Sequence, residues 1–320
     1  DKPWFAHLNS SKRSVTLDLK NADAWKLLRP LIEWADVVVE NFSPGTMAKL
    51  GLGYDDLKAI NSGIVMVSGS VYGQTGPLAQ EWGIDGTGGA LSGRTYMTGY
   101  PDADPVIPGA VPYGDVIVPF VMAACAAAAL QHRRETGQGC HVDASMFEIC
   151  VQQMRPYLAQ AKAGERPQRS GNADPALFHQ QVYPAAGEDR WVAISLFDAS
   201  EYDRLVELTG PDIAAWTSQH GDIEAAQALQ SIGIAAGAVQ DCGNMVDEDP
   251  QLAMRGALVR LDHPFLGPFG HTATPMRFSR DKPQPFPAPR MGEHTHQIAR
   301  EVCGLDESEI ARLESEGVFK

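Results

Sequence analysis

The chain has 320 residues with 26 basic and 40 acidic side chains, which gives a formal net charge of -14 at pH 7. This length predicts a substantial core and two domains. The acidic balance argues against nucleic acid as a partner, so a polyanionic ligand needs a local basic site. The five cysteines are scattered without a C-x-x-C pair, which indicates neither a disulfide framework nor a zinc site and favours a cytoplasmic location.

The first part of the chain alternates between strand and helix patterns. The expected order is strand 14–19, helix 22–34, strand 36–40, helices 47–50 and 54–60, and strand 64–68. A further strand is expected at 141–144. Such alternation predicts an α/β fold with a doubly wound parallel sheet.

A long apolar run at residues 116–130 predicts a buried core helix, because 15 residues are short for spanning a bilayer. We therefore expect no membrane partner. Asp115 lies directly before this run, where the free N–H groups and the dipole of the helix favour an anion. A carboxylate held there can serve as a nucleophile. The alternative is that Asp115 is only the N-cap of the helix.

The second part of the chain begins with a polar segment rich in Gly and Pro at 166–175, which indicates a domain crossing. The patterns that follow predict a strand at 190–196, a helix at 200–209, an irregular Pro-rich strap at 264–289, and helices at 295–303 and 307–316. We expect a large α/β domain at 1–170, a small α+β domain at 171–255, and a return strap with C-terminal helices of the large domain at 256–320.

One expected strand end carries polar residues suited to ligand binding. Asn41 and Phe42 follow the strand at 36–40, and ligands of open α/β sheets bind beyond the carboxyl ends of strands. Lys12 and Lys49 are cations near such ends, and together they predict a basic phosphate site. Taken singly, each segment is better explained as an ordinary loop or as solvated surface. His294 and His296 lack further ligands nearby, so no metal site is predicted.

Several conventional motifs are absent. The segment at 86–91 lacks the third glycine of the dinucleotide fingerprint, and no P-loop occurs. The serine in the segment at 69–73 is one place early for a hydrolase nucleophile elbow.

Taken in order, several segments resemble the class III CoA-transferases, the family that includes formyl-CoA transferase and carnitine CoA-transferases. The matching segments are residues 9–15, 35–42, 50–54, 72–77, 114–115, 134–139 and 292–295. The resemblance implies that Asp115 is the catalytic aspartate that becomes linked to CoA, and that Lys12, Asn41, Phe42 and Lys49 contact CoA. It further implies an interlaced dimer, with CoA as part of the substrate and without a permanently bound cofactor or a metal.

The function that this resemblance implies is transfer of CoA from an acyl-CoA to a carboxylic acid. A weaker resemblance to transferases of dicarboxylic acids implies that this acid is a dicarboxylate. One alternative is a 2-methylacyl-CoA racemase of the same family. Ile84 argues against it, because resembling racemases have histidine there as a second acid/base group. The other alternative is a non-catalytic CoA-binding subunit of a heteromeric transferase, in which case the partner is a related chain rather than a second copy.

Overall fold

The computed structural model describes residues 3–107, 112–281 and 283–319. The chain forms two compact units that each combine distant parts of the sequence. The first unit comprises Asp1–Gly69, Met122–Asp143 and Gly243–Lys320, and the second comprises Ser70–Val121 and Ala144–Cys242. The domain bounds expected at residues 170 and 255 stay a prediction.

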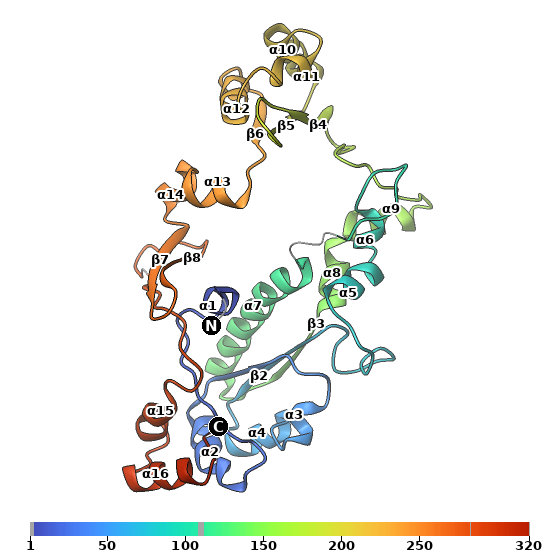
Figure 1. The fold of residues 1–320 in the computed structure, drawn as a ribbon. Helices are drawn as coiled ribbons and strands as arrows, with labels where there is room; N and C mark the ends of the chain where they lie inside the picture. The colour runs from blue at the N-terminus through green and yellow to red at the C-terminus, as the bar shows by residue number, and fades with distance from the viewer. Residues whose placement is uncertain (1–2, 108–111, 282, 320) are drawn as a thin grey trace. The chain divides into compact units, whose positions relative to one another are not determined.

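The first unit is built around a three-stranded sheet in the order β1-β2-β3 (Figure 1). The strands are β1 (Val37–Glu40), β2 (Val65–Ser70) and β3 (His141–Ser145), close to the three expected positions. β1 and β2 are parallel, with Val37 opposite Val65. The mixed α/β class with a parallel strand pair is therefore confirmed.

Alternate side chains of β2 pack against helices on opposite faces of the sheet. On one face Met66 and Ile64 join a core with α2 (Trp25–Trp34) and α4 (Tyr54–Ile60). On the other face Val65 and Val67 pack against Ala129 of α7 (Tyr113–Thr136). A strand covered on both faces has a continuous apolar run, which is the pattern that β2 shows.

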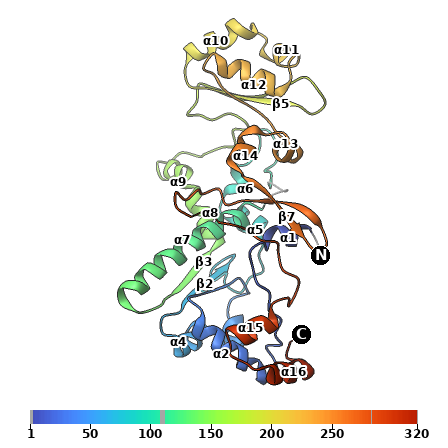
Figure 2. The same ribbon diagram turned by 90° about the vertical axis from the view of Figure 1, so that its left-hand side faces the viewer.

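The C-terminal helices complete the first unit by packing on α2, as Figure 2 shows. These helices are α15 (Thr295–Glu301) and α16 (Glu307–Ser315), near both predicted positions. Leu27 of α2 is fully buried in one cluster with Ile310 and Leu313 of α16. The expected helix start at residue 22 is instead a short 3-10 turn, η1 (Ala22–Ala24).

The expected strand at residues 14–19 is wrong. This segment pairs with no strand, because residues near the C-terminus take up its backbone groups. The Thr16 N–H donates to Thr295 Oγ1 over 3.0 Å, and Ser14 O accepts from the His294 N–H over 2.9 Å. Alternating side chains indicate a half-exposed extended segment, and here another part of the chain replaces the neighbouring strand.

The prediction of a buried core helix at 116–130 is correct that a helix forms but wrong that the helix is buried. The helix forms as α7, but only 17% of its most apolar 18-residue window is buried. By length and composition it is the one helix among the described residues that could cross a membrane. Core helices of soluble proteins also meet these two criteria. Val118 and Ala129 are buried, whereas Val116 and Phe120 are exposed.

The second unit contains an antiparallel sheet of β4 (His179–Pro184), β5 (Trp191–Leu196) and β6 (Ala235–Ala238). Three helices are close to this sheet: α10 (Ala199–Thr209), α11 (Ile213–Thr217) and α12 (Asp222–Ser231). The predicted strand at 190–196 and helix at 200–209 are confirmed. Val192, Ile194 and Leu196 of β5 are fully buried against Leu205 and Leu229.

The Pro-rich stretch is more regular than expected. A hairpin of β7 (Leu258–His263) and β8 (Gly267–Thr272) extends into it, although Pro268 lies within β8. Proline is tolerated there because β8 pairs with only one neighbour. The described residues from 273 to 289 contain no helix or strand, as the proline content predicts. Before the hairpin lie α13 (Cys242–Asp247) and α14 (Pro250–Arg255).

Candidate active site

Asp115 lies in the first turn of α7 with its side chain exposed. The helix begins at Tyr113, so Asp115 is the third helical residue and the alternative that it is the N-cap is wrong. The Val116 N–H already donates to Pro112 O over 3.1 Å, which closes the first turn before Asp115. The carboxylate is therefore free to meet a substrate.

A buried ion pair lies beside this turn. Asp85 is the first residue of α5 (Asp85–Leu91), and Arg94 is the first residue of α6 (Arg94–Met97). Arg94 Nη2 donates to both Asp85 oxygens, over 3.1 and 3.3 Å. Asp85 Oδ1 also accepts the N–H of Gly114, the residue before Asp115. The Arg94 guanidinium lies over the Tyr113 ring, 5.0 Å from its centre.

This surrounding raises the pKa of Asp115 above its usual value. Partial burial of the carboxylate is the largest cause, and the negative charge of Asp85 adds to it. Both effects disfavour the anion, in opposition to the helix N-terminus, which favours it. Asp115 is thus more basic than an ordinary aspartate.

The cysteine nearest this pair is not activated. Cys150 of α8 (Met146–Gln153) is fully buried, and burial raises the pKa of its thiol despite the opposing effect of Arg94. A thiol with a raised pKa is a poor nucleophile at neutral pH. Asp115 is therefore the better nucleophile of the two.

Ile84 precedes Asp85 and is 72% exposed. Its backbone N–H donates to Thr87 Oγ1 over 2.9 Å, and Ile84 is the N-cap residue before α5. An isoleucine side chain cannot carry a proton, and the position therefore offers apolar surface without a second acid/base group.

The four predicted CoA-contacting residues all lie in the first unit, whereas Asp115 lies in the second. Lys12, Asn41, Phe42 and Lys49 are all exposed. Asn41 and Phe42 follow β1, as predicted, and Lys49 is the last residue of α3 (Thr46–Lys49).

Local contacts shape two of these positions. The Glu40 carboxylate is buried at the end of β1 and accepts the Phe42 N–H over 2.9 Å, which fixes the turn. Lys12 Nζ donates to Asn9 Oδ1 over 3.0 Å. This contact lies between residues three positions apart on the exposed surface.

The two histidines considered as metal ligands have structural partners. His294 Nδ1 accepts from the Ser14 N–H over 3.2 Å, and His296 Nε2 lies 3.3 Å from a Glu314 oxygen. No group of metal-binding side chains occurs among the described residues.

Sequence reasoning missed Asp85 and Arg94. They lie nine positions apart on two short helices, a spacing that no common motif marks. The available signal was the glycine content of α5, because Gly88 and Gly89 are buried there. Buried glycines in a helix indicate a close approach by another group.

The chain belongs to CoA-transferase family III, whose sequence pattern matches residues 1–212 and 207–295. This result confirms the resemblance drawn from the sequence. It also makes the protein an enzyme of the CoA-transferase class.

Individual relatives agree with this assignment. Succinyl-CoA–D-citramalate CoA-transferase of Chloroflexus aurantiacus is 28% identical over 342 residues, covering 99% of this chain and 84% of that protein. Human succinyl-CoA:glutarate CoA-transferase is 27% identical over 342 residues, covering 99% and 78%. A solved CaiB/BaiF family structure from Brucella suis has a TM-score of 0.84 at 27% identity, covering 93% of this chain and 84% of its own.

Proposed function

We propose that this enzyme moves CoA from an acyl-CoA donor to a carboxylic acid acceptor through an aspartyl-CoA thioester on Asp115. The observation that carries the proposal is the exposed Asp115 carboxylate in the first turn of α7, with a raised pKa and a buried ion pair beside it. Among carboxylates, a higher pKa means a more reactive electron pair.

The first half of the reaction loads CoA onto the enzyme. An Asp115 oxygen attacks the carbonyl carbon of the donor thioester, the C–S bond breaks, and a mixed anhydride forms with release of CoA thiolate. The thiolate then attacks the Asp115 carbonyl carbon of the anhydride. Its C–O bond breaks, which leaves aspartyl-CoA thioester and the free donor carboxylate.

The second half repeats these steps with the acceptor. The acceptor carboxylate attacks the aspartyl thioester and forms a new anhydride with release of CoA thiolate. The thiolate attacks the acceptor carbonyl carbon, which yields acceptor-CoA and regenerates the Asp115 carboxylate. Covalent capture conserves the free energy of the thioester as long as water is excluded from the intermediates.

Lys12, Asn41, Phe42 and Lys49 are proposed to hold the CoA moiety. The lysines supply the positive charge that the CoA phosphates need in a protein of net charge -14. The exposed Phe42 ring offers a flat apolar face for the adenine.

The acids exchanged are proposed to be dicarboxylic acids. The two transferases compared above are named for succinyl-CoA with citramalate or glutarate, and all three of these acids have two carboxyl groups. The remaining proposals are a doubly wound large domain, a small α+β domain, an interlaced homodimer, and a cytoplasmic location. Assembly with a related but different subunit is the alternative to the homodimer.

The proposal is tested by incubating the enzyme with succinyl-CoA and a panel of free dicarboxylic acids. We expect new acyl-CoA products and, without acceptor, a CoA adduct on the peptide that contains Asp115, detected by mass spectrometry. Asp115→Asn should abolish both signals, because an amide cannot form the anhydride. Exchange by this variant at near the wild-type rate would exclude the mechanism.

A second assay separates transferase from racemase. Incubation of a 2-methylacyl-CoA with the enzyme in heavy water should leave the α-carbon unlabelled, because Ile84 supplies no second base. Deuterium uptake at the rate of turnover would assign the protein as a racemase instead.

A further inference from the structure

The ion pair between Asp85 and Arg94 is nearly inaccessible to water. The Asp85 side chain is 8% exposed and the Arg94 side chain 12%. Charges are buried at a considerable desolvation cost, and replacement of such pairs by apolar residues often leaves stability unchanged or improved. Stability alone therefore gives little reason for this pair to be ionic.

Asp85 is connected directly to the turn that carries Asp115. Its Oδ1 accepts the Gly114 N–H, one residue before Asp115. A Cβ atom added at Gly114 would lie 2.6 Å from Asp85 Oδ1 and 2.8 Å from Met146 Cγ. Glycine is thus required at position 114 for the carboxylate to reach the helix backbone.

A second glycine makes room for Arg94. A Cβ atom added at Gly89 would overlap the Arg94 guanidinium, which is confined on its other side by the Tyr113 ring. Gly86 in the same helix differs, because a Cβ atom there would meet nothing within 4 Å. Of these two glycines of α5, Gly89 therefore accommodates the guanidinium.

We propose that Asp85, held by Arg94, is the positioning residue of the nucleophile: it fixes the first turn of α7 and places a second negative charge beside Asp115. The inference rests on the proposed aspartyl-CoA mechanism. When Asp115 forms the anhydride or the thioester it becomes neutral, and its negative charge leaves on the CoA thiolate or the donor carboxylate. The repulsion between Asp85 and Asp115 is then relieved, which favours the acylated enzyme.

The neighbouring groups agree with this role. Asp85 on α5 is the charged group that raises the pKa of Asp115, after partial burial. Arg94 on α6 lies against Tyr113 and Asp85. On α8 the Cys150 thiol has a raised pKa and is neutral at pH 7. Asp85 is therefore the negatively charged neighbour that these groups supply to Asp115.

The test compares single-turnover formation of the CoA adduct in Asp85→Asn and in the double variant Asp85→Asn/Arg94→Met. The double variant leaves no unpaired buried cation, so it guards against a folding defect. In both we expect adduct formation to slow by on the order of 10²-fold, the effect of misplacing a reacting group, with KM for acyl-CoA nearly unchanged. The acid limb of the pH–rate profile, where the rate falls as Asp115 is protonated, should move to lower pH because Asp115 loses the negative charge of Asp85 beside it. An unmoved acid limb would leave only a structural role and overturn the proposal.

A matched pair of glycine variants gives an independent test. Gly89→Ala and Gly86→Ala make the same change in the same helix, with the same gain in helix propensity. We expect Gly89→Ala to lower the rate of adduct formation at least tenfold by displacing Arg94, and Gly86→Ala to keep the wild-type rate. Equal rates in the two variants would overturn the proposal.

The experiments distinguish a failure of the aspartyl-CoA mechanism from a failure of the positioning role of Asp85. If Asp115→Asn retains exchange, the aspartyl mechanism is wrong and the role of Asp85 falls with it. If Asp115→Asn is inactive while the Asp85 and Gly89 variants match the wild type, only the positioning role is wrong.

Discussion

Asp115 shows how three local effects combine at one residue. The first turn of a helix stabilises an anion, whereas partial burial and the negative charge of Asp85 destabilise it. Of the two causes that raise its pKa, desolvation is the larger. Under the proposed mechanism, reaction with a thioester neutralises this carboxylate and relieves both effects.

This balance predicts that Asp115→Asn stabilises the folded protein at neutral pH. The folded state raises the pKa of Asp115, so ionisation of this group opposes folding once the pH exceeds that pKa. Because the side chain is exposed and screened by solvent, we expect a rise in Tm of roughly 1–2 °C at pH 7. The difference should disappear as the pH falls below 4, where wild-type Asp115 is protonated. Scanning calorimetry across pH checks this.

Asp198 provides a control of opposite sign. A hydrogen bond from the Ser200 hydroxyl and one from the Glu201 N–H lower its pKa at the N-terminus of α10. Asp198→Asn should therefore lower Tm at pH 7, and this loss should also vanish in acid. A rise in Tm for both variants would show a general effect of removing negative charge from an acidic protein.

The predicted CoA site is tested by Lys12→Ala and Lys49→Ala. Each variant loses one charge-assisted contact to a phosphate, worth about 1–3 kcal/mol, so KM for acyl-CoA should rise roughly 5- to 150-fold with little change in kcat. Steady-state kinetics measure the effect. Lys162→Ala, an exposed lysine at the end of α9 (Arg155–Lys162), is the control that should leave KM unchanged. Unchanged KM in both test variants would place the phosphates elsewhere.

At the scale of elements, hydrophobic periodicity correctly predicted the buried strands. β1, β2 and β5 were found from apolar runs because buried strands need such runs whatever their partners are. Residues 14–19 were misassigned because the same alternation of side chains occurs in an extended segment that is not a strand. Its backbone N–H groups donate to Thr295 and Val318 instead. The exposure of α7 and the Asp85–Arg94 contact depend on tertiary packing, which one-dimensional patterns do not contain.

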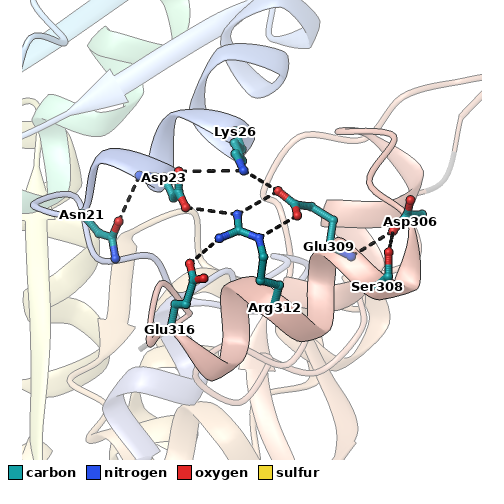
Figure 3. Close-up of polar contacts among 8 residues, drawn as sticks. All are labelled: Asn21, Asp23, Lys26, Asp306, Ser308, Glu309, Arg312 and Glu316. Atoms are coloured by element: carbon teal, nitrogen blue, oxygen red, sulfur yellow. Dashed lines mark hydrogen bonds and ion pairs between the residues drawn. The ribbon is translucent and has the colours of Figure 1, made fainter.

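The C-terminal helix α16 is attached by a charged network in addition to its apolar face (Figure 3). Arg312 binds Glu309 over 2.8 Å and Asp23 over 3.1 Å, and it also pairs with Glu316. Lys26 of α2 reaches Glu309 over 2.5 Å. These contacts lower the pKa of Glu309 from 4.5 to about 2, with the hydrogen bond from Arg312 as the largest cause.

This network predicts a pH-dependent contribution to stability. A carboxylate with a lowered pKa stabilises the folded state above pH 4.5, and the contribution is lost as the pH falls toward 2. Arg312→Met should lower Tm by a few degrees at pH 7, with a smaller difference at pH 3. Arg29→Met removes a single exposed i,i+4 pair with Glu33 and should change Tm much less. Equal losses in the two variants would show that the network adds nothing beyond separate pairs.

At the scale of the whole molecule, the exposed apolar surface of α7 requires explanation. Val116 is 46% exposed and Phe120 53%, close in sequence to Asp115. An apolar helix face left in water is unfavourable by about 25 cal/mol per Å² relative to a covered one. We expect a covering partner to bury this face, as the proposed interlaced dimer would.

The final prediction is that the active enzyme is a dimer whose contact includes α7. Sedimentation at micromolar concentration should give twice the mass of the chain, and Val116→Ser/Phe120→Ser should weaken association because it removes apolar area from the contact. Phe197→Ser changes a 67% exposed aromatic side chain directly after β5 and should leave the mass unchanged. A monomer with full exchange activity would contradict the dimer. A monomer that becomes active only with a related chain would instead identify a heteromer, in which that chain covers the same face of α7.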